Sequence, residues 1–276
     1  MPNEISPGTP GPRIHVHTTV LTDGTLTVPV NSYLVEGPEA VLVVDTGPGG
    51  EPSEELLTAW RRIAGDRPLV VALTHDHWDH FFGNAQFLSG GVPGWGAEAS
   101  GPTGPGVREF RASAGFVRDR AASAYLQFEE AGAVAPGLPE NPGDVLIGEL
   151  STLGHGEIEP IATGDTIDLG GGVEVTARVF TGHTETDLVL VVGDVAIVGD
   201  LVEEGAPPQF DDALPAAWAN SLQDLLGLQG ASGAGIGTFL PGHGRPVDRA
   251  FVEQQAADIA AVAADEADSA PARTMV

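Results

Sequence analysis

Short apolar runs that end in polar side chains recur in both halves of the chain and constrain its fold more than any other feature. The first half has such runs at Val41–Val44 and Leu69–Leu73, and the second half has them at Leu188–Val192 and Val195–Val198. Continuous β-branched runs without polar alternation are typical of strands that are covered on both faces. Because helical stretches and Gly-rich turns separate them, they predict a layered α/β architecture of two similar halves.

The remaining apolar patterns complete this outline. Further strands are predicted over Ile14–Val20, Leu26–Val35, Thr166–Leu169, Val173–Phe180 and Thr238–Leu240. The Asp-Gly pair in Thr22-Asp23-Gly24 predicts a tight hairpin turn between the first two of these. Helices are predicted over Ser53–Ala64, Arg111–Gly132, Pro215–Leu228 and Asp248–Ala264, and Ser53 is the expected N-cap of the first.

We expect a single domain over residues 1–276. Residues 1–12 are rich in Pro and Gly and predict a flexible lead-in, and residues from about 265 onward predict a frayed tail. The segment from about 100 to 159 is long for a connection between the halves. We interpret it as a helical insertion that either covers a site or packs outside the core.

The composition excludes several classes of chemistry. The chain has no Cys, and all 12 of its basic residues are Arg against 39 acidic residues, giving a net charge of -27. Thiolate sites, disulfides and lysine Schiff bases are therefore excluded. Such a charge repels nucleic acid, and the apolar runs are shorter than the roughly 20 residues of a membrane-spanning helix. The N-terminus has no apolar segment typical of a signal peptide. We expect a cytoplasmic protein with a small-molecule substrate; its oligomeric state is not predicted.

The densest polar cluster follows the strand predicted over Leu69–Leu73. The run Thr74–His80 contains three histidines, His75, His77 and His80, together with Asp79. Burying so many polar groups is costly unless they bind something. Neutral imidazole and carboxylate are good ligands for Zn, Fe or Mn. The run therefore predicts a metal site at the end of this strand.

Further candidate ligands follow other predicted strands. His183 lies in Thr181–Thr184, Asp200 follows Val195–Val198, and His243 follows Thr238–Leu240. Each has a neighbouring glycine, which permits close approach of the backbone. Taken singly each is a weak signal, but together they indicate that several strand ends meet at one site.

These motifs resemble those of the metallo-β-lactamase superfamily, and the ligand set is most similar to the glyoxalase II-like, dinuclear branch. The matching motifs run in the family's order: VNSYLV at Val30, VDTG at Val44, THDHWDH at Thr74, TGHT at Thr181, GD at Gly199 and PGHG at Pro241. The resemblance implies an αββα sandwich of two similar halves, with the metals at one edge of the sheets.

The resemblance also implies how the ligands are divided. It places His75, His77 and His183 on one metal ion, and Asp79, His80 and His243 on the other, with Asp200 bridging the two. The expected cofactors are two divalent ions, zinc first, with iron or manganese as alternatives. The chain lacks the Cys ligand of one β-lactamase group, and its bridging Asp is atypical of β-lactamases.

The expected activity is hydrolysis of a small ester, thioester or lactone. Metal binding lowers the pKa of water to roughly 7, which supplies hydroxide to attack a carbonyl group at neutral pH. Asp79 is the candidate catalytic residue that orients this hydroxide and passes its proton to the leaving group. The alternatives are an iron-dependent oxidoreductase on the same fold and, less favoured, a phosphodiesterase.

Several neighbouring residues have open roles. Asp45 is expected to orient a ligand loop, and Trp78 to line the pocket, whereas Phe81 and Phe82 line it or pack in the core. Arg245 either meets a substrate carboxylate or forms a surface salt bridge, and His155 either reaches the site or lies in a solvated loop. The alternating His15 and His17 predict a solvent-facing row.

Overall fold

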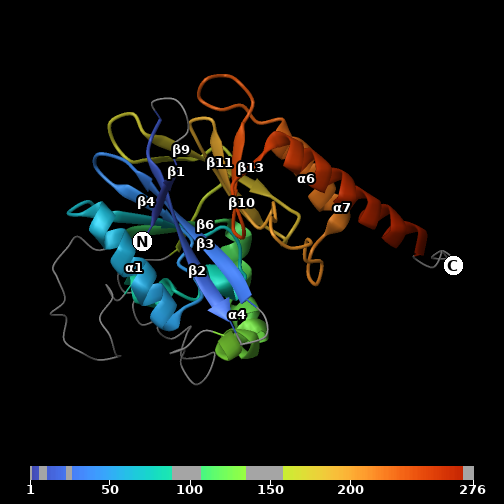
Figure 1. The fold of residues 1–276 in the computed structure, drawn as a ribbon, viewed down its shortest axis with the longest axis horizontal. Coiled ribbons are helices and arrows are strands. Elements are labelled where there is room, and N and C mark those ends of the chain that lie inside the picture. The colour runs from blue at the N-terminus through green and yellow to red at the C-terminus, as the bar shows by residue number, and fades with distance from the viewer. Residues whose placement is uncertain (1, 6–10, 23–26, 89–106, 135–157, 270–276) are drawn as a thin grey trace.

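The protein is a four-layer sandwich in which two β-sheets lie face to face and helices cover the outer face of each sheet (Figure 1). The computed structural model describes residues 2–5, 11–22, 27–88, 107–134 and 158–269. The arrangement confirms the predicted α/β sandwich. None of the helices in these described ranges is both long and apolar enough to cross a membrane.

The first sheet contains seven strands that lie side by side in sequence order. They are β1 (Asn3–Ile5), β2 (Ile14–Thr22), β3 (Thr27–Glu36), β4 (Val41–Val44), β5 (Leu69–Ala72), β6 (Val107–Ala112) and β7 (Ile158–Pro160). The strands from β1 to β4 pair antiparallel, and those from β4 to β7 pair parallel. The carboxyl ends of β4 and β5 therefore lie together at one edge.

The second sheet contains six strands in the order β13-β12-β11-β10-β9-β8. They are β8 (Thr166–Asp168), β9 (Glu174–Phe180), β10 (Asp187–Val192), β11 (Val195–Gly199), β12 (Thr238–Pro241) and β13 (Val247–Asp248). Only β11 and β12 pair parallel among these described strands; the other neighbours are antiparallel. The ends of β11 and β12 consequently leave this sheet on the same side.

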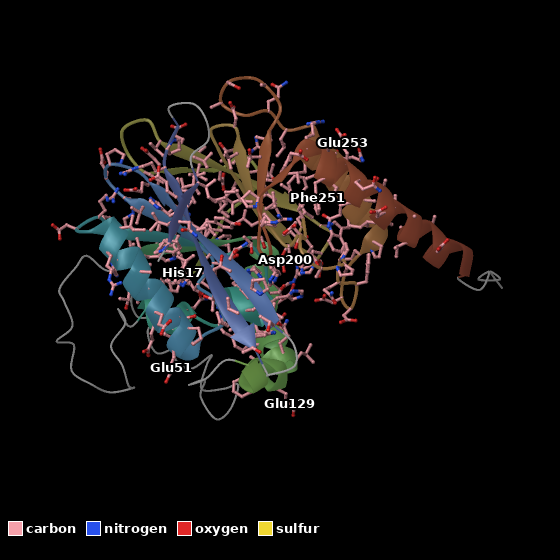
Figure 2. All side chains as sticks on the ribbon, in the orientation of Figure 1. His17, Glu51, Glu129, Asp200, Phe251 and Glu253 are labelled. Carbon is pink, nitrogen blue, oxygen red and sulfur yellow. The ribbon has the colours of Figure 1, made fainter. Side chains whose placement is uncertain are left out.

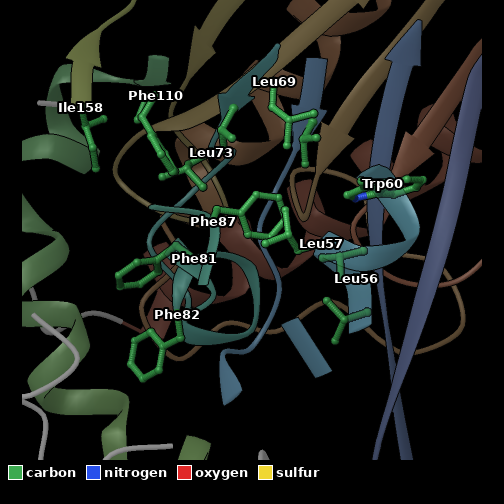
Figure 3. Packing of buried hydrophobic residues seen from close by; sticks show 14 of the residues in the cluster. Leu56, Leu57, Trp60, Leu69, Leu73, Phe81, Phe82, Phe87, Phe110 and Ile158 are labelled. Atoms are coloured by element: carbon green, nitrogen blue, oxygen red, sulfur yellow. The ribbon is translucent and has the colours of Figure 1, made fainter. Parts of the chain in front are cut away.

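Apolar side chains fill three layers. The helices on the first sheet are α1 (Gly50–Ala64), α2 (Trp78–Phe81), α3 (Asn84–Leu88) and α4 (Ala114–Val134). Trp60, Phe81, Phe87 and Phe110 pack in the layer beneath them (Figure 3). The second sheet is covered by α6 (Pro215–Leu226) and α7 (Arg249–Ser269), whose layer includes Trp218.

The layer between the sheets explains the continuous apolar runs. Along β4, Val41 and Val43 face the helical layer, whereas Leu42 and Val44 face the other sheet. Alternate side chains of a strand point to opposite faces, and both faces are buried here. The runs predicted from the sequence therefore coincide with the strands at the centre of the fold.

The segment expected to be an insertion is partly built into the first sheet. β6 pairs parallel with β5, and β7 pairs with β6, so the helical insertion predicted over about residues 100–159 also contributes two strands that were not predicted. Three charged residues in Val107–Ala112 hide the strand pattern, although Phe110 and Ala112 are buried. The helix predicted over Arg111–Gly132 begins later, at Ala114.

Three further predictions at the ends of elements need correction. The lead-in contains β1, which pairs with β2, and α7 continues to Ser269 rather than ending at Ala264. Gly49, not Ser53, is the N-cap of α1. Ser53 lies inside the helix, where its buried hydroxyl accepts a hydrogen bond from the Gly49 amide at 2.8 Å and donates one to the Thr46 carbonyl at 2.8 Å. The predicted turn at residues 22–24 falls largely outside the described residues.

Candidate metal centre

The ends of strands from both sheets converge at one edge of the sandwich. His75, His77, Asp79 and His80 follow β5, whereas His183, Asp200 and His243 follow β9, β11 and β12. Asp200 lies where the two halves of the chain meet (Figure 2). The structure thus brings together all seven residues that the sequence nominated as metal ligands.

The loop after β5 is fixed by a carboxylate from the neighbouring strand. Asp45 accepts hydrogen bonds from the amide and the hydroxyl of Thr74, both at 2.8 Å. The Asp45 backbone has a φ of 65°, a left-handed conformation that is costly for residues other than glycine. The Leu188 amide donates to the Thr74 carbonyl at 2.7 Å and connects the loop to the second sheet. Asp45 therefore orients the ligand loop, as its sequence suggested.

Helix α4 supports the same loop from the other side. The Gln127 side chain accepts a hydrogen bond from the Trp78 amide at 2.6 Å and donates one to the Asp76 carbonyl at 3.1 Å. Ser123 donates a hydrogen bond to the Asp76 carboxylate. The sequence analysis did not single out Gln127 or Ser123, because contacts between distant segments leave no local pattern.

The candidate ligands form two clusters. In the first, the facing ring nitrogens of His77 (Nδ1) and His183 (Nε2) lie 2.9 Å apart, close to His75 and Asp200. In the second, Nε2 of His243 lies 3.3 Å from Asp79 Oδ2 and 3.4 Å from Nε2 of His80. The nominated ligand atoms within each cluster all lie within 4.8 Å of one another.

Asp200 contacts both clusters. Its Oδ2 atom lies 3.7 Å from Nε2 of His75 and of His183, 3.5 Å from Nε2 of His80 and 3.1 Å from Nε2 of His243. Burial would raise the pKa of this carboxyl, but His243, His80 and His75 hold it well below its usual range. The carboxylate is therefore ionised between the clusters.

The second ring nitrogen of each histidine faces a group outside the cluster. Four form hydrogen bonds, to Thr74 Oγ1 for His75 (2.9 Å), Asp212 for His77 (3.1 Å), Asp45 for His80 (2.9 Å) and the Pro29 carbonyl for His243 (2.7 Å). His183 Nδ1 lies 3.1 Å from Glu203 as an ion-pair contact. Such outer partners fix ring orientation in metal sites and raise ligand basicity. Asp212 and Glu203 carry no local sequence pattern that predicts this role, although both lie within 12 residues of Asp200.

The chemistry of these side chains fits bound divalent cations. Within the described part of the chain, His75 Nε2 and Asp200 Oδ1 are buried without a hydrogen-bond partner. The close approach of His77 Nδ1 to His183 Nε2 is also the arrangement expected of nitrogens that share a cation. A buried polar group without a partner is costly, and a cation bound between the clusters would satisfy these atoms.

The pKa values of the cluster follow from burial and neighbouring charge. Burial lowers the pKa of His75 well below its usual value. For His183 burial acts in the same direction, but Glu203 and Asp200 outweigh it and raise the pKa to about 9. Burial would raise the pKa of Asp79, whereas His80 and His243 bring it down to about 2.

A cavity of about 520 Å³ opens over the two clusters. Its walls include Trp78, Gln127 and Val28, together with His77 and His243. Phe81 and Phe82 do not line it, because both are 2% exposed and pack in the helical layer. The cavity gives a small molecule access to both clusters.

The contacts of Arg245, His15 and His17 show which of their predicted roles the structure supports. Arg245 pairs with Glu204 at 2.9 Å, as a surface salt bridge. The expected solvent-facing row of histidines was wrong: His15 is buried against Glu36, and the His17 ring packs edge-on against Trp60. His155 lies outside the described residues.

A four-layer sandwich with two groups of His and Asp side chains at one edge is typical of proteins that bind divalent cations. The sequence model of the metallo-beta-lactamase superfamily matches residues 26–243, and the chain belongs to this superfamily. No match is found among curated proteins. Membership and the His/Asp cluster together support a metal-dependent hydrolase.

Solved structures share the fold over nearly the whole chain. A metallo-beta-lactamase from Pontibacter korlensis is 20% identical with a TM-score of 0.60, covering 94% of this chain and 99% of its own. The mono-zinc form of FIM-1 from Pseudomonas aeruginosa is 16% identical with a TM-score of 0.62, covering 95% and 96%. A metallo beta lactamase from Hirschia baltica is 18% identical with a TM-score of 0.59, covering 94% and 97%. At these identities the likeness concerns the fold alone.

Proposed function

We propose that the protein is a dinuclear metal-dependent hydrolase of a small ester, thioester or lactone, with the ligand arrangement of the glyoxalase II-like branch. The observation that carries the proposal is the position of Asp200, whose Oδ2 atom lies within 3.7 Å of inward nitrogens from both clusters. A carboxylate in this position is suited to bridge two cations, one held by each group of histidines.

The side chains of the site supply binding and proton handling. Two divalent cations bound there would lower the pKa of a water molecule and polarise a carbonyl group. Asp79 borders the cavity and is the candidate to orient the attacking water and to pass its proton to the leaving oxygen or sulfur. Hydrolysis then adds hydroxyl to the acyl carbon and a proton to the leaving group, so that an acid and an alcohol or thiol are released.

Imidazole and carboxylate ligands suit zinc first, and also iron and manganese. The net charge of -27 supports a small-molecule substrate in place of nucleic acid or a membrane. An iron-dependent oxidoreductase and a phosphodiesterase on the same fold remain the alternatives that an experiment must separate.

Metal analysis combined with a substrate screen tests the proposal. We expect about two zinc ions per chain in protein purified without chelators, and fewer in His77→Ala, with His17→Gln as a matched control outside the clusters. Zinc-loaded protein should hydrolyse thioesters, esters or lactones faster than phosphodiesters or β-lactams. Iron with oxygen consumption would favour the oxidoreductase, and failure to bind any metal after reconstitution would overturn the proposal.

A further inference from the structure

The cavity over the clusters is lined by carboxylates and, among the described residues, by no arginine or lysine side chain. Beyond Asp79 and Asp200, its lining includes Glu203, Glu204, Asp211 and Asp212, all on the loop that follows β11. Asp211 and Asp212 are exposed, and Glu203 is buried against His183. A ligand entering the cavity therefore passes several negative charges.

None of the arginines in the described part of the chain lines the cavity. Arg245 neutralises Glu204 from outside the cavity. Arg67 pairs with Glu36, and Arg111 pairs with Glu109 and Glu159. The chain has no Lys, and the sequences of residues 89–106 and 135–157 contain no Arg. The described lining of the cavity therefore offers no arginine or lysine to receive an anionic substrate.

The balance of charge in the cavity is negative even with metals bound. Two divalent cations with Asp79, Asp200 and a hydroxide leave the floor at about +1, and Glu203, Asp211 and Asp212 then bring the whole cavity to about -2. The floor, formed by the metal ions with Asp79 and Asp200, can stabilise an oxyanion. The mouth, where Asp211 and Asp212 are exposed, attracts positive charge. Trp78, which is 8% exposed, also lines the cavity, and aromatic rings bind quaternary ammonium groups.

We propose that the substrate carries a cationic group, an ammonium or a quaternary ammonium, at its non-reacting end, which Asp211 and Asp212 hold beside Trp78. This inference rests on the proposed hydrolase function. The cavity itself marks where a ligand binds, because its lining includes nominated metal ligands of both clusters, among them His77 and His243. An anionic substrate is repelled by the mouth and finds attraction only at the floor.

Equilibrium binding tests the charge preference without turnover. Choline and 3,3-dimethylbutan-1-ol have the same shape and differ in charge, and calorimetry on the zinc-loaded protein at low salt measures both. A unit charge about 6 Å away changes affinity about three- to tenfold, so two carboxylates should favour choline by at least about tenfold, less at high salt. Equal affinities, or no choline binding, would overturn the proposal.

Two matched variants separate the cavity from the general field of an acidic protein. Asp211→Asn should weaken choline binding about three- to tenfold and leave the neutral alcohol unaffected. Asp224→Asn removes an exposed carboxylate on α6 that does not line the cavity, and should leave choline binding unchanged. An equal loss in both variants would contradict a local cation site.

Thioester turnover distinguishes this proposal from the proposed function. The substrates are acetylthiocholine, 3,3-dimethylbutyl thioacetate and S-acetyl-3-mercaptopropanoate, and released thiol is read with a thiol reagent, which the Cys-free chain does not consume. Turnover of the neutral thioester tests the hydrolase. A kcat/KM that falls from cationic to neutral to anionic supports the inference, whereas a preference for the anion overturns it. If none of the three thioesters is hydrolysed, the proposed thioesterase activity is contradicted. The comparison of choline with the neutral alcohol then still tests the charge preference of the cavity.

Discussion

The two clusters of the metal centre are held in place in different ways. In the first, the outer nitrogens of His77 and His183 face the carboxylates of Asp212 and Glu203, both on the loop after β11. In the second, His80 is bonded to Asp45, which is 2% exposed, and His243 to a backbone carbonyl.

The strands support the second cluster more directly. From β3, Asn31 donates to the Pro241 and Gly244 carbonyls at 3.1 Å and 2.9 Å, and Tyr33 donates to the Pro241 carbonyl at 2.6 Å. The His243 turn is therefore tied to the opposite sheet. The outer partners of His77 and His183 are thus side chains of one loop next to the cavity, whereas the second cluster is fixed by the packing of the two sheets.

The largest effect is expected where the clusters meet. Asp200→Asn keeps the size of the side chain but removes the charge that faces both groups of histidines, so we expect metal loss at both and a fall in activity of about 10³-fold or more. Elemental analysis and circular dichroism check metal content and folding. If one full equivalent of metal remains tightly bound, Asp200 serves only one cluster.

Close packing at the second cluster is tested with glycines. A Cβ atom at Gly242 would lie 2.0 Å from Asp200 Oδ1 and 2.7 Å from His80 Cε1, so Gly242→Ala should lower the free energy of unfolding by about 1–3 kcal/mol and impair metal binding. Gly237→Ala is the control, since a Cβ there meets nothing within 4 Å. Denaturant unfolding measures both variants, and equal stability would contradict the tight contact.

Acid should weaken metal binding, and more steeply at the second cluster. Carboxylates outweigh burial and raise the pKa of His80 and His243 well above the usual value, and raise that of His183 to about 9. A cation must displace these protons, and each displaced proton weakens apparent affinity about tenfold per pH unit below its pKa. Competition with a chelator between pH 6 and pH 8 measures the slopes; affinity independent of pH would contradict this account.

Asp45→Asn acts mainly on the second cluster, because Asp45 contacts the His80 ring directly and reaches His75 only through Thr74. Asparagine tolerates the left-handed backbone of this position, and its oxygen can still accept from Thr74, but it no longer presents a charge to His80. Metal affinity at the second cluster should fall about 10- to 100-fold, with little change at the first. Equal weakening of both phases in a metal titration would show that Asp45 fixes the whole loop rather than one imidazole.

The smallest effect is expected for Asp212→Asn. The side chain of Asp212 is 60% exposed, so water replaces part of its interaction with His77, and metal affinity at the first cluster should fall about tenfold. Asp211→Asn is the matched control. Among the described residues, the Asp211 carboxylate forms no hydrogen bond or ion pair with a histidine of either cluster. If both variants bind metal equally well, solvent suffices to orient His77.

The sequence predicted the elements that are buried on both faces most accurately. The strand predicted over Val41–Val44 coincides with β4, because a continuous apolar run leaves no ambiguity about burial. β6 was missed because Arg108, Glu109 and Arg111 mask its two buried residues. Serine is a residue type favoured at N-cap positions, which is why Ser53 was predicted to be one. The helix instead begins earlier, after the Gly47–Gly50 turn, and the Ser53 hydroxyl forms hydrogen bonds with this turn.

The order of residues along the chain already shows which side chains are available to bind metal. His75, His77, Asp79 and His80 lie in one short loop, and glycines beside His183, Asp200 and His243 indicate where the chain turns after a strand. The tertiary structure decided how these groups meet. The contact between His77 and His183 spans 106 residues, and only the packing of two sheets sets such a distance. The same packing brings Asp212 and Glu203 to the imidazoles and surrounds the cavity with carboxylates, because spatial neighbours from separate loops leave no shared pattern in the sequence.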